Sequence, residues 1–240
     1  MKRQPISYER ALKQHSEYKC ALQKLGLRVI SLPSEPELPD SVFVEDTALV
    51  LNELAVIGAT AVASRHPELL AIKDFLSQYR EIESLGEGAK FEGGDVVRRG
   101  KTIYVGESRR TCQNAFERLH KVLEPLGYNL RRVRVLHCLH LSTGATYVGN
   151  DTILANPKWI DVSAFTDCRV ISVCEEEPWA ANTLTVDGVV LMPEGFPKTR
   201  FVLEQNGFCV HTVDISEFLK AEGSVSCLTN LIDADIVLSE

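Results

Sequence analysis

The sequence predicts an α/β fold in which one strand–strand–helix–strand unit is repeated and arranged as a ring of five. Three observations support this prediction. Two-residue turns begin at positions 52, 99, 150, 187 and 233, and each separates two short runs of strand-forming residues. A helical pattern and one further apolar strand follow each of the first four hairpins. The chain starts with a helix and a strand and ends with a hairpin, so its two ends together supply the fifth unit.

The first element is a helix over residues 7–25, with Leu12, Tyr18 and Leu22 on its inward face. A strand over residues 27–32 follows it. Five hairpins then come in order, at residues 48–57, 96–105, 145–155, 184–192 and 227–238. Their turns include Arg-Gly, Asn-Asp and Asp-Gly pairs, which suit the positive φ angles of tight hairpins.

Helices and single strands fill the spaces between the hairpins. Pro67 suits the first turn of one helix, and Ser108 is the expected cap of another with Ala115 and Leu119 facing inward. Shorter helices are expected at 157–166 and 197–206. The strands that follow the helices are expected at 81–85, 132–136, 169–173 and 208–213. No linker or low-complexity segment interrupts this order, so we expect residues 1–240 to form a single domain.

Composition and charge exclude several classes of protein. Apolar residues make up 45% and charged residues 25% of the chain, which excludes disordered and fibrous proteins. The net charge of −7 argues against nucleic acid as a partner. No apolar run approaches the roughly 20 residues that a membrane span requires. The seven cysteines are odd in number and irregularly spaced, which favours thiols in a reducing, cytoplasmic location over a disulfide framework.

Reactive side chains cluster immediately before the hairpins. In a closed ring, equivalent positions of the repeat converge at one end, so these side chains should meet in one pocket. The residues are Asp40, Glu45, Asp46, Glu92, Asp95, His140, Asn182 and Cys227. The sequence therefore predicts a site that combines a thiol, an imidazole and several carboxylates.

Neither a metal nor a nucleotide is expected at this site. Cys138 and His140 are two positions apart, but such a pair alone is not specific for metal binding. The chain contains no glycine-rich phosphate loop, which argues against nucleotides. The sequence thus predicts a site that works without a cofactor.

Six motifs in order resemble the dimethylarginine dimethylaminohydrolase family. They are Asp40-Ser-Val-Phe-Val-Glu-Asp46, Phe91-Glu-Gly-Gly-Asp95, Tyr104-Val-Gly-Glu-Ser-Arg-Arg-Thr111, Leu139-His-Leu-Ser-Thr-Gly144, Trp179-Ala-Ala-Asn182 and Val225-Ser-Cys227. The family belongs to the guanidine-modifying pentein superfamily, so the resemblance implies a five-bladed α/β propeller whose first blade is incomplete at the N-terminus. It covers nearly the whole chain, from about residue 4 to residue 232.

The resemblance implies the catalytic residues and the reaction. Cys227 matches the nucleophile, His140 the general acid and base, and Glu92 a carboxylate that pairs with the substrate guanidinium. A guanidinium is a poor electrophile, and a cysteine thiolate is a good nucleophile near neutral pH. The expected reaction converts asymmetric dimethylarginine to citrulline and dimethylamine through a thiouronium on the cysteine, without metal or cofactor.

The resemblance also implies how a methylated arginine is bound. Asp46 matches a second partner of the guanidinium, and Glu45 supports it from the same loop. Arg65 and Arg110 match the arginines that clamp the substrate carboxylate, and Asp40 matches a residue near its α-amino group. A small molecule is thus the expected partner, and the sequence leaves a homodimer open.

Two departures from the family pattern accompany the match. Family members begin with about twenty further residues, which form a first strand and a mobile lid over the active site. They also commonly carry Thr-Arg-Pro-Gly after the second strand of the first hairpin, where this chain has Gly58-Ala-Thr-Ala61. We further expect residues 235–238 to fold back on 228–232 and replace the missing strand.

Two other activities fit the same residues. One is a deiminase acting on unmethylated arginine, which would share the cysteine, histidine and carboxylates. The other is a pentein that binds its ligand without catalysis, which the missing lid favours. Citrulline formation from dimethylarginine and from arginine distinguishes the three hypotheses.

Overall fold

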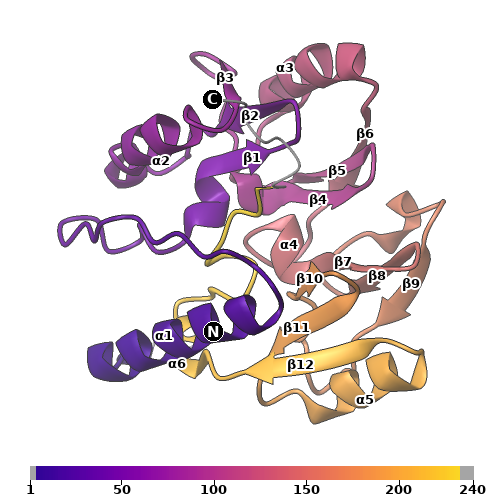
Figure 1. The fold of residues 1–240 in the computed structure, drawn as a ribbon. Coiled ribbons are helices and arrows are strands. Elements are labelled where there is room, and N and C mark those ends of the chain that lie inside the picture. Colours follow the sequence, from indigo (N-terminus) through magenta and orange to yellow (C-terminus); the bar gives the residue numbers. More distant parts are fainter. Residues whose placement is uncertain (1–3, 233–240) are drawn as a thin grey trace. The chain divides into compact units, whose positions relative to one another are not determined.

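The computed structural model describes residues 4–232 and divides them into two compact units (Figure 1). Unit 1 contains residues 4–33 and 142–226, and unit 2 contains residues 34–141 and 227–232. Unit 2 is therefore assembled from two segments that most of unit 1 separates in the sequence. No helix in the described part of the chain is long and apolar enough to cross a membrane.

Each unit contains two sheets of three strands, and all four sheets have the same topology. In each, two antiparallel strands form a hairpin and the third strand lies parallel to the second. Unit 2 holds β1 (Ala48–Val50), β2 (Leu54–Ile57), β3 (Glu81–Ser84), β4 (Val96–Arg99), β5 (Thr102–Glu107) and β6 (Asn129–Arg134). Unit 1 holds β7 (Ala145–Gly149), β8 (Thr152–Ala155), β9 (Arg169–Ser172), β10 (Leu184–Val186), β11 (Val189–Pro193) and β12 (Cys209–Val213).

These sheets confirm the three strands of the predicted unit at four of its five positions, and an α-helix connects the second and third strands in three of the four. The turns carry the positive φ angles that their residues favour, with φ of 54° at Gly100, 48° at Asn150, 51° at Asp151 and 46° at Asp187. The β6 strand begins three residues earlier than the sequence predicted, because Asn129 already pairs with Thr102 of β5.

The described helices follow the predicted spacing with two exceptions, and two short helices, at residues 141–144 and 216–219, were not predicted. The helices are α1 (Tyr8–Lys24), α2 (Glu68–Leu76), α3 (Gln113–Leu123), α4 (Leu141–Gly144), α5 (Pro197–Gln205) and α6 (Ser216–Leu219). Helix α3 packs on β6 and helix α5 packs on β12, as Figure 1 shows. Tyr18 and Leu22 of α1 are buried as predicted, whereas Leu12 is exposed.

The two exceptions arise from side chains that bond to nearby backbone. Ser108 does not cap α3, because its hydroxyl instead accepts hydrogen bonds from the Arg110 and Thr111 amides within a turn. The helix predicted at 157–166 is only a 3₁₀ turn, Val162–Ala164, and Asp161 caps it by accepting from the Ser163 amide.

Each unit has its own apolar core. In unit 2, Val56, Phe91 and Ile103 pack with Leu119 and Leu123 of α3. In unit 1, Leu154, Val190 and Met192 pack with Leu203 of α5 and Val210 of β12. These cores hold each hairpin against its helix and so fix the segments that lead into the hairpins.

Two predicted strands are absent from the described residues. Residues 27–32 and 227–232 have no strand assignment, and no described strand pairs with either of them. A strand is stabilised by the ladder of hydrogen bonds with its neighbour, so an apolar run without a neighbour stays irregular. The predicted return strand at 235–238 lies outside the described residues.

Candidate active site

Three segments of unit 2, each of which precedes a hairpin in the sequence, bring three charged side chains together. Asp46 lies in the 3₁₀ turn η1 (Val44–Thr47) before β1, and Glu92 directly precedes the 3₁₀ turn η3 (Gly93–Asp95) before β4. His140 directly precedes α4. One side-chain atom from each of the three residues lies within 4.8 Å of the others, and all three residues are buried. This cluster confirms that residues before successive hairpins converge within unit 2.

The two glycines of the Phe91–Asp95 motif make this approach sterically feasible. A Cβ atom at Gly94 would lie 2.6 Å from Asp46 Oδ1 and 2.9 Å from the His140 ring. A Cβ at Gly93 would lie 2.1 Å from the Glu45 carbonyl oxygen. These distances are shorter than van der Waals contact, so any side chain at position 93 or 94 would push the cluster apart.

Glu92 and His140 form a buried ion pair. His140 Nε2 lies 2.7 Å from Glu92 Oε2, and the two residues are 3% and 0% exposed. Burial would lower the pKa of His140, but the nearby carboxylates of Asp46, Glu92 and Asp95 raise it to about 9. Burial would raise the pKa of Glu92, but hydrogen bonds from His140 and Thr60 lower it to about 2. The imidazole is thus protonated and can donate a proton.

Asp46 offers one carboxylate oxygen that is not yet used. Its Oδ2 accepts a hydrogen bond from Arg65 Nη1 at 2.6 Å. Its Oδ1 is buried and, among the described residues, is the one buried side-chain nitrogen or oxygen without a hydrogen-bond partner. His140 Nδ1 lies 3.6 Å from it, within ion-pair distance but beyond a hydrogen bond. An unsatisfied buried carboxylate oxygen is costly, so this atom is the natural acceptor for a cationic ligand.

Arg65 is held from all sides by the protein. Its guanidinium bonds to Asp46, to both carboxylate oxygens of Glu68, and to the backbone carbonyl oxygens of Asp40 and Phe43. These acceptors raise the pKa of Arg65 above its ordinary value, although burial opposes them. In this arrangement Arg65 fixes Asp46 and the loop that carries Asp40.

Arg110 is more accessible than Arg65. Its side chain is 23% exposed, and Nη1 lies 3.3 Å from Glu92 Oε1. The turn that carries it is tied to the cluster through Ser108, whose hydroxyl donates to Asp95 Oδ2 at 2.5 Å. The other oxygen of Asp95 accepts from the backbone amide of Leu141, next to His140. Asp95 thereby connects the turn of Arg110 to the segment of His140.

Cys227 lies beside the turn that carries Asp46. The Glu45 amide donates to the Cys227 carbonyl oxygen at 3.2 Å, and Asn230 donates to the Val44 carbonyl oxygen at 2.7 Å. Cys227 is buried, Glu45 is partly buried and Asp40 is exposed. The backbone of the predicted nucleophile is thus anchored to η1, one residue from Asp46.

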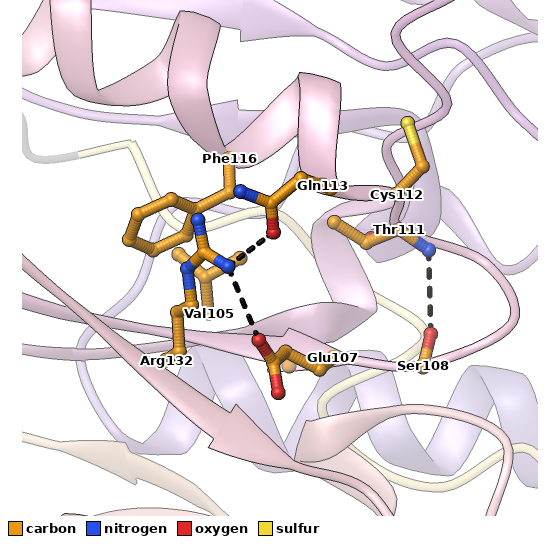
Figure 2. A pocket seen from close by; sticks show the side chains of 9 residues that line it. Val105, Glu107, Ser108, Thr111, Cys112, Gln113, Phe116 and Arg132 are labelled. Carbon is orange, nitrogen blue, oxygen red and sulfur yellow. Dashed lines mark hydrogen bonds and ion pairs between the residues drawn. The ribbon is translucent and has the colours of Figure 1, made fainter.

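Two other features of unit 2 are separate from this cluster. The Cys138 thiol donates to the His140 carbonyl oxygen, so it does not point with the imidazole toward a shared metal. A cavity of about 280 Å³ lies between α3 and the β5–β6 strands (Figure 2). Its Arg132 already bonds to Glu107 and Gln113 and stacks on Phe116, so its charged groups satisfy one another.

The sequence did not identify three residues that bond to the predicted site. Thr60 donates to Glu92, Glu68 holds Arg65, and Ser108 holds Asp95. The departure of Gly58–Ala61 from the family pattern was a signal for Thr60. Glu68 and Ser108 had no signal, because their partners are identified only by the fold.

Comparison with protein-family models identifies the chain. The model described as "N,N dimethylarginine dimethylhydrolase, eukaryotic" matches residues 1–232. The chain belongs to the dimethylarginine dimethylaminohydrolase family. A family member from Pseudomonas aeruginosa, N(G),N(G)-dimethylarginine dimethylaminohydrolase, is 35% identical over 224 residues, which cover 92% of this chain and 88% of the relative.

Solved structures agree with this assignment. The Pseudomonas aeruginosa family member, as a cysteine-to-serine mutant complexed with citrulline, superimposes with a TM-score of 0.89 at 35% identity, covering 93% of this chain and 88% of its own. The N-terminal domain of ArgZ, a cyanobacterial arginine dihydrolase, gives a TM-score of 0.86 at 23% identity and covers 94% of this chain and 86% of its own. The predicted α/β pentein fold is confirmed by these similarities.

Proposed function

We propose that this member of the dimethylarginine dimethylaminohydrolase family hydrolyses asymmetric dimethylarginine to citrulline and dimethylamine. Family membership supports the reaction class, and the open Oδ1 of Asp46 is the observation in this chain that favours a cationic substrate. A guanidinium can donate an N–H to that oxygen and so satisfy a buried charge. Citrulline, the ligand in the related solved structure, is the expected product.

The proposed mechanism divides the reaction into two steps. The Cys227 thiolate attacks the central guanidino carbon, and protonated His140 gives its proton to the departing dimethylamine. The result is a thiouronium in which the carbon is bonded to the cysteine sulfur. Water then attacks this carbon while neutral His140 takes its proton, and collapse of the intermediate releases citrulline and restores the thiolate.

Each of the other predicted residues has a proposed role that suits its position. Glu92 stays the predicted partner of the substrate guanidinium, and the proposal adds that it keeps His140 protonated and oriented. Its Oε1 accepts a hydrogen bond from Arg110. Arg110 is exposed enough to bind the substrate carboxylate, as the sequence predicted. Arg65 was predicted to share that clamp, and the proposal adds that it positions Asp46. Asp40 and Glu45 stay predicted contacts near the α-amino group and in the supporting loop.

The deciding experiment measures citrulline from purified protein with three substrates: asymmetric dimethylarginine, monomethylarginine and arginine. The proposal expects turnover of the methylated substrates and a much smaller kcat/KM for arginine. Turnover of arginine alone would favour a deiminase. If isothermal titration showed binding of dimethylarginine but no citrulline formed, the protein would be a binding member of the family.

The remaining predictions about assembly and location need experiments of their own. Sedimentation of the purified protein at several concentrations tests the homodimer. Fractionation of the source cells tests the cytoplasmic location that the cysteine pattern predicted. Electrophoretic mobility of a DNA or RNA probe tests the expected lack of nucleic-acid binding.

A further inference from the structure

The segment after β2 is held against the motif that contains Glu92. The amide of Ala59 donates to the Phe91 carbonyl oxygen at 2.9 Å, and the amide of Phe91 donates back at 3.1 Å. The Gly58 amide donates to the Thr47 carbonyl oxygen at 2.7 Å. A Cβ at Gly58 would lie 2.9 Å from the Phe91 carbonyl oxygen, so a glycine permits this close approach. The backbone therefore places the next residue, Thr60, beside Glu92.

The Thr60 hydroxyl can donate in one direction only. The Val62 amide donates to Thr60 Oγ1 at 3.2 Å, which occupies a lone pair of the hydroxyl. Thr60 Oγ1 lies 2.6 Å from Glu92 Oε1, and both residues are buried. A hydroxyl carries a single proton, and a carboxylate can only accept. The proton of Thr60 therefore points at Glu92.

This hydrogen bond helps to fix the plane of the Glu92 carboxylate. Oε1 accepts from Thr60, from the Ala61 amide at 3.1 Å and from Arg110 at 3.3 Å. With Oε1 held on one side, Oε2 is directed at His140 Nε2. Thr60 makes the shortest of the three contacts to Oε1, so it contributes most to this orientation.

We propose that Thr60 is a positioning residue, which acts through Glu92 to hold the His140 imidazole in the orientation that donates a proton to the leaving amine. The catalytic part of this proposal rests on the proposed function. The geometric part, that the Thr60 hydroxyl orients the Glu92–His140 pair, holds whichever guanidino compound is the substrate. A merely structural contact would contribute to folding without affecting the imidazole.

The test compares variants that remove or keep the hydroxyl. Thr60→Val keeps the shape and removes the proton donor, Thr60→Ala removes the donor in a smaller side chain, and Thr60→Ser keeps the donor. The control is Thr152→Val in β8 of unit 1, where a buried threonine hydroxyl donates to the Asn150 carbonyl oxygen. Melting temperature and circular dichroism select the variants that fold.

Two measurements are made on each folded variant. The first is kcat and KM for citrulline formation, because an orientation effect on the proton donor lowers kcat and spares KM. The second is the His140 Nε2–H resonance in protein labelled with [¹⁵N]histidine, assigned with a His140→Gln variant. Among the described groups, Asp46, Glu92 and Asp95 face this imidazole, and none of them is changed in the Thr60 variants.

We expect Thr60→Val and Thr60→Ala to lower kcat by about tenfold or more, because the free energy of a hydrogen bond to a charged group corresponds to a rate change of at least about this size. The Nε2–H resonance should shift or broaden in both, while Thr60→Ser and Thr152→Val resemble the wild type. Wild-type kcat together with an unchanged resonance in Thr60→Val would overturn the proposal, as would a Thr60→Ser variant as impaired as Thr60→Val. Should the wild type form no citrulline, the proposed function fails, and the resonance alone still decides the role of Thr60.

Discussion

The segment before β10 in unit 1 and the segment before β1 in unit 2 occupy the same place in the repeat but are chemically opposite. In unit 1, the Asn182 side chain donates to the Ser142 carbonyl oxygen and to Ser226 Oγ, and it accepts from the Ser226 amide. In unit 2, Asp46 uses one oxygen on Arg65 and leaves the other without a hydrogen-bond partner. The side-chain amide of Asn182 is hydrogen-bonded within unit 1, whereas one carboxylate oxygen of Asp46 has no hydrogen-bond partner.

This contrast shows that equivalent positions in two copies of the repeat can serve folding in one copy and ligand binding in the other. A buried amide with every group bonded adds specificity to the fold and offers nothing to a ligand. A buried carboxylate with an unpaired oxygen lowers the free energy of unfolding of the ligand-free protein, and a bound cation can compensate for this loss. Substitutions in the charged segment should therefore reduce activity, whereas substitutions in the neutral segment should reduce stability.

The largest effect is expected at Cys227, a buried cysteine whose backbone carbonyl oxygen bonds to the charged segment. Cys227→Ser should reduce citrulline formation by at least about a thousandfold, since the nucleophile is lost. Binding of dimethylarginine, measured by isothermal titration, should persist. The control is Cys112→Ser, a partly buried cysteine of the same unit. Residual activity above about a tenth of the wild-type value would refute the nucleophile assignment.

Exchanging the two polar side chains tests the comparison directly. Asp46→Asn should lower kcat/KM by about a hundredfold, because a neutral amide replaces the charge that faces the guanidinium. Asn182→Asp should instead destabilise unit 1 by about 2–4 kcal/mol in urea unfolding, since a carboxylate cannot donate to Ser142 or Ser226. Equal effects of both variants on activity and on stability would show that the contrast has no functional meaning.

Alkaline pH should lower the stability of the folded protein, because His140 loses its proton. The folded pKa of His140, about 9, lies above the ordinary value of 6.5. Its contribution to stability is therefore complete below pH 6.5 and is lost as the pH rises through 9, at a cost of about 3 kcal/mol. Urea unfolding of the wild type and of His140→Gln at pH 7 and at pH 10 isolates the contribution of His140 to this loss of stability. Identical losses in the two proteins would contradict the raised pKa.

The two arginines should differ in what their loss affects. Arg110→Ala should raise KM by about tenfold with little change in melting temperature, because its side chain is partly exposed. Arg65→Ala should lower the melting temperature as well as kcat, because it leaves Asp46 and Glu68 buried without their partner. If Arg65→Ala altered only KM, the arginine would be a substrate clamp and the internal bonds would be incidental.

The smallest effect is expected at an exposed ion pair of unit 2. Lys101 of the β4–β5 turn bonds to Glu53 of the β1–β2 turn and lies over the Tyr128 ring, and its side chain is 53% exposed. Lys101→Ala should cost less than about 1 kcal/mol in urea unfolding and leave kcat unchanged. A larger loss of stability would mean that an exposed ion pair stabilises the fold as much as the buried charges of the cluster do.

The repeat was predictable because it depends on local signals. Turn residues such as Arg99-Gly100 and Asp187-Gly188 determine φ angles within two positions, and the helix faces follow a 3.6-residue period. The convergence of Asp46, Glu92 and His140 followed from their equivalent places in the repeat. These predictions needed no knowledge of which residues pair across long distances.

The errors occurred where pairing decides the structure. Residues 27–32 have the composition of a strand, yet no described strand pairs with them. Ser108 has the identity of a helix cap, yet Asp95 and two nearby amides take its hydroxyl. Apart from the departure of Gly58–Ala61 from the family pattern, nothing in the sequence indicated the role of Thr60, because its partner Glu92 is distant in sequence and is brought near by the Ala59–Phe91 bridge.

The attachment of Cys227 to the Asp46 turn has a consequence for the order of events during synthesis. The Asn230–Val44 hydrogen bond joins residues 186 positions apart, so this contact closes one of the longest loops in the chain. A ribosome completes residues 34–141 well before it reaches Cys227, and the intervening segment belongs to the other unit. The charged cluster can therefore form before Cys227, the proposed nucleophile, has been synthesised. Under the proposed mechanism, activity is gained in one late step of folding rather than gradually.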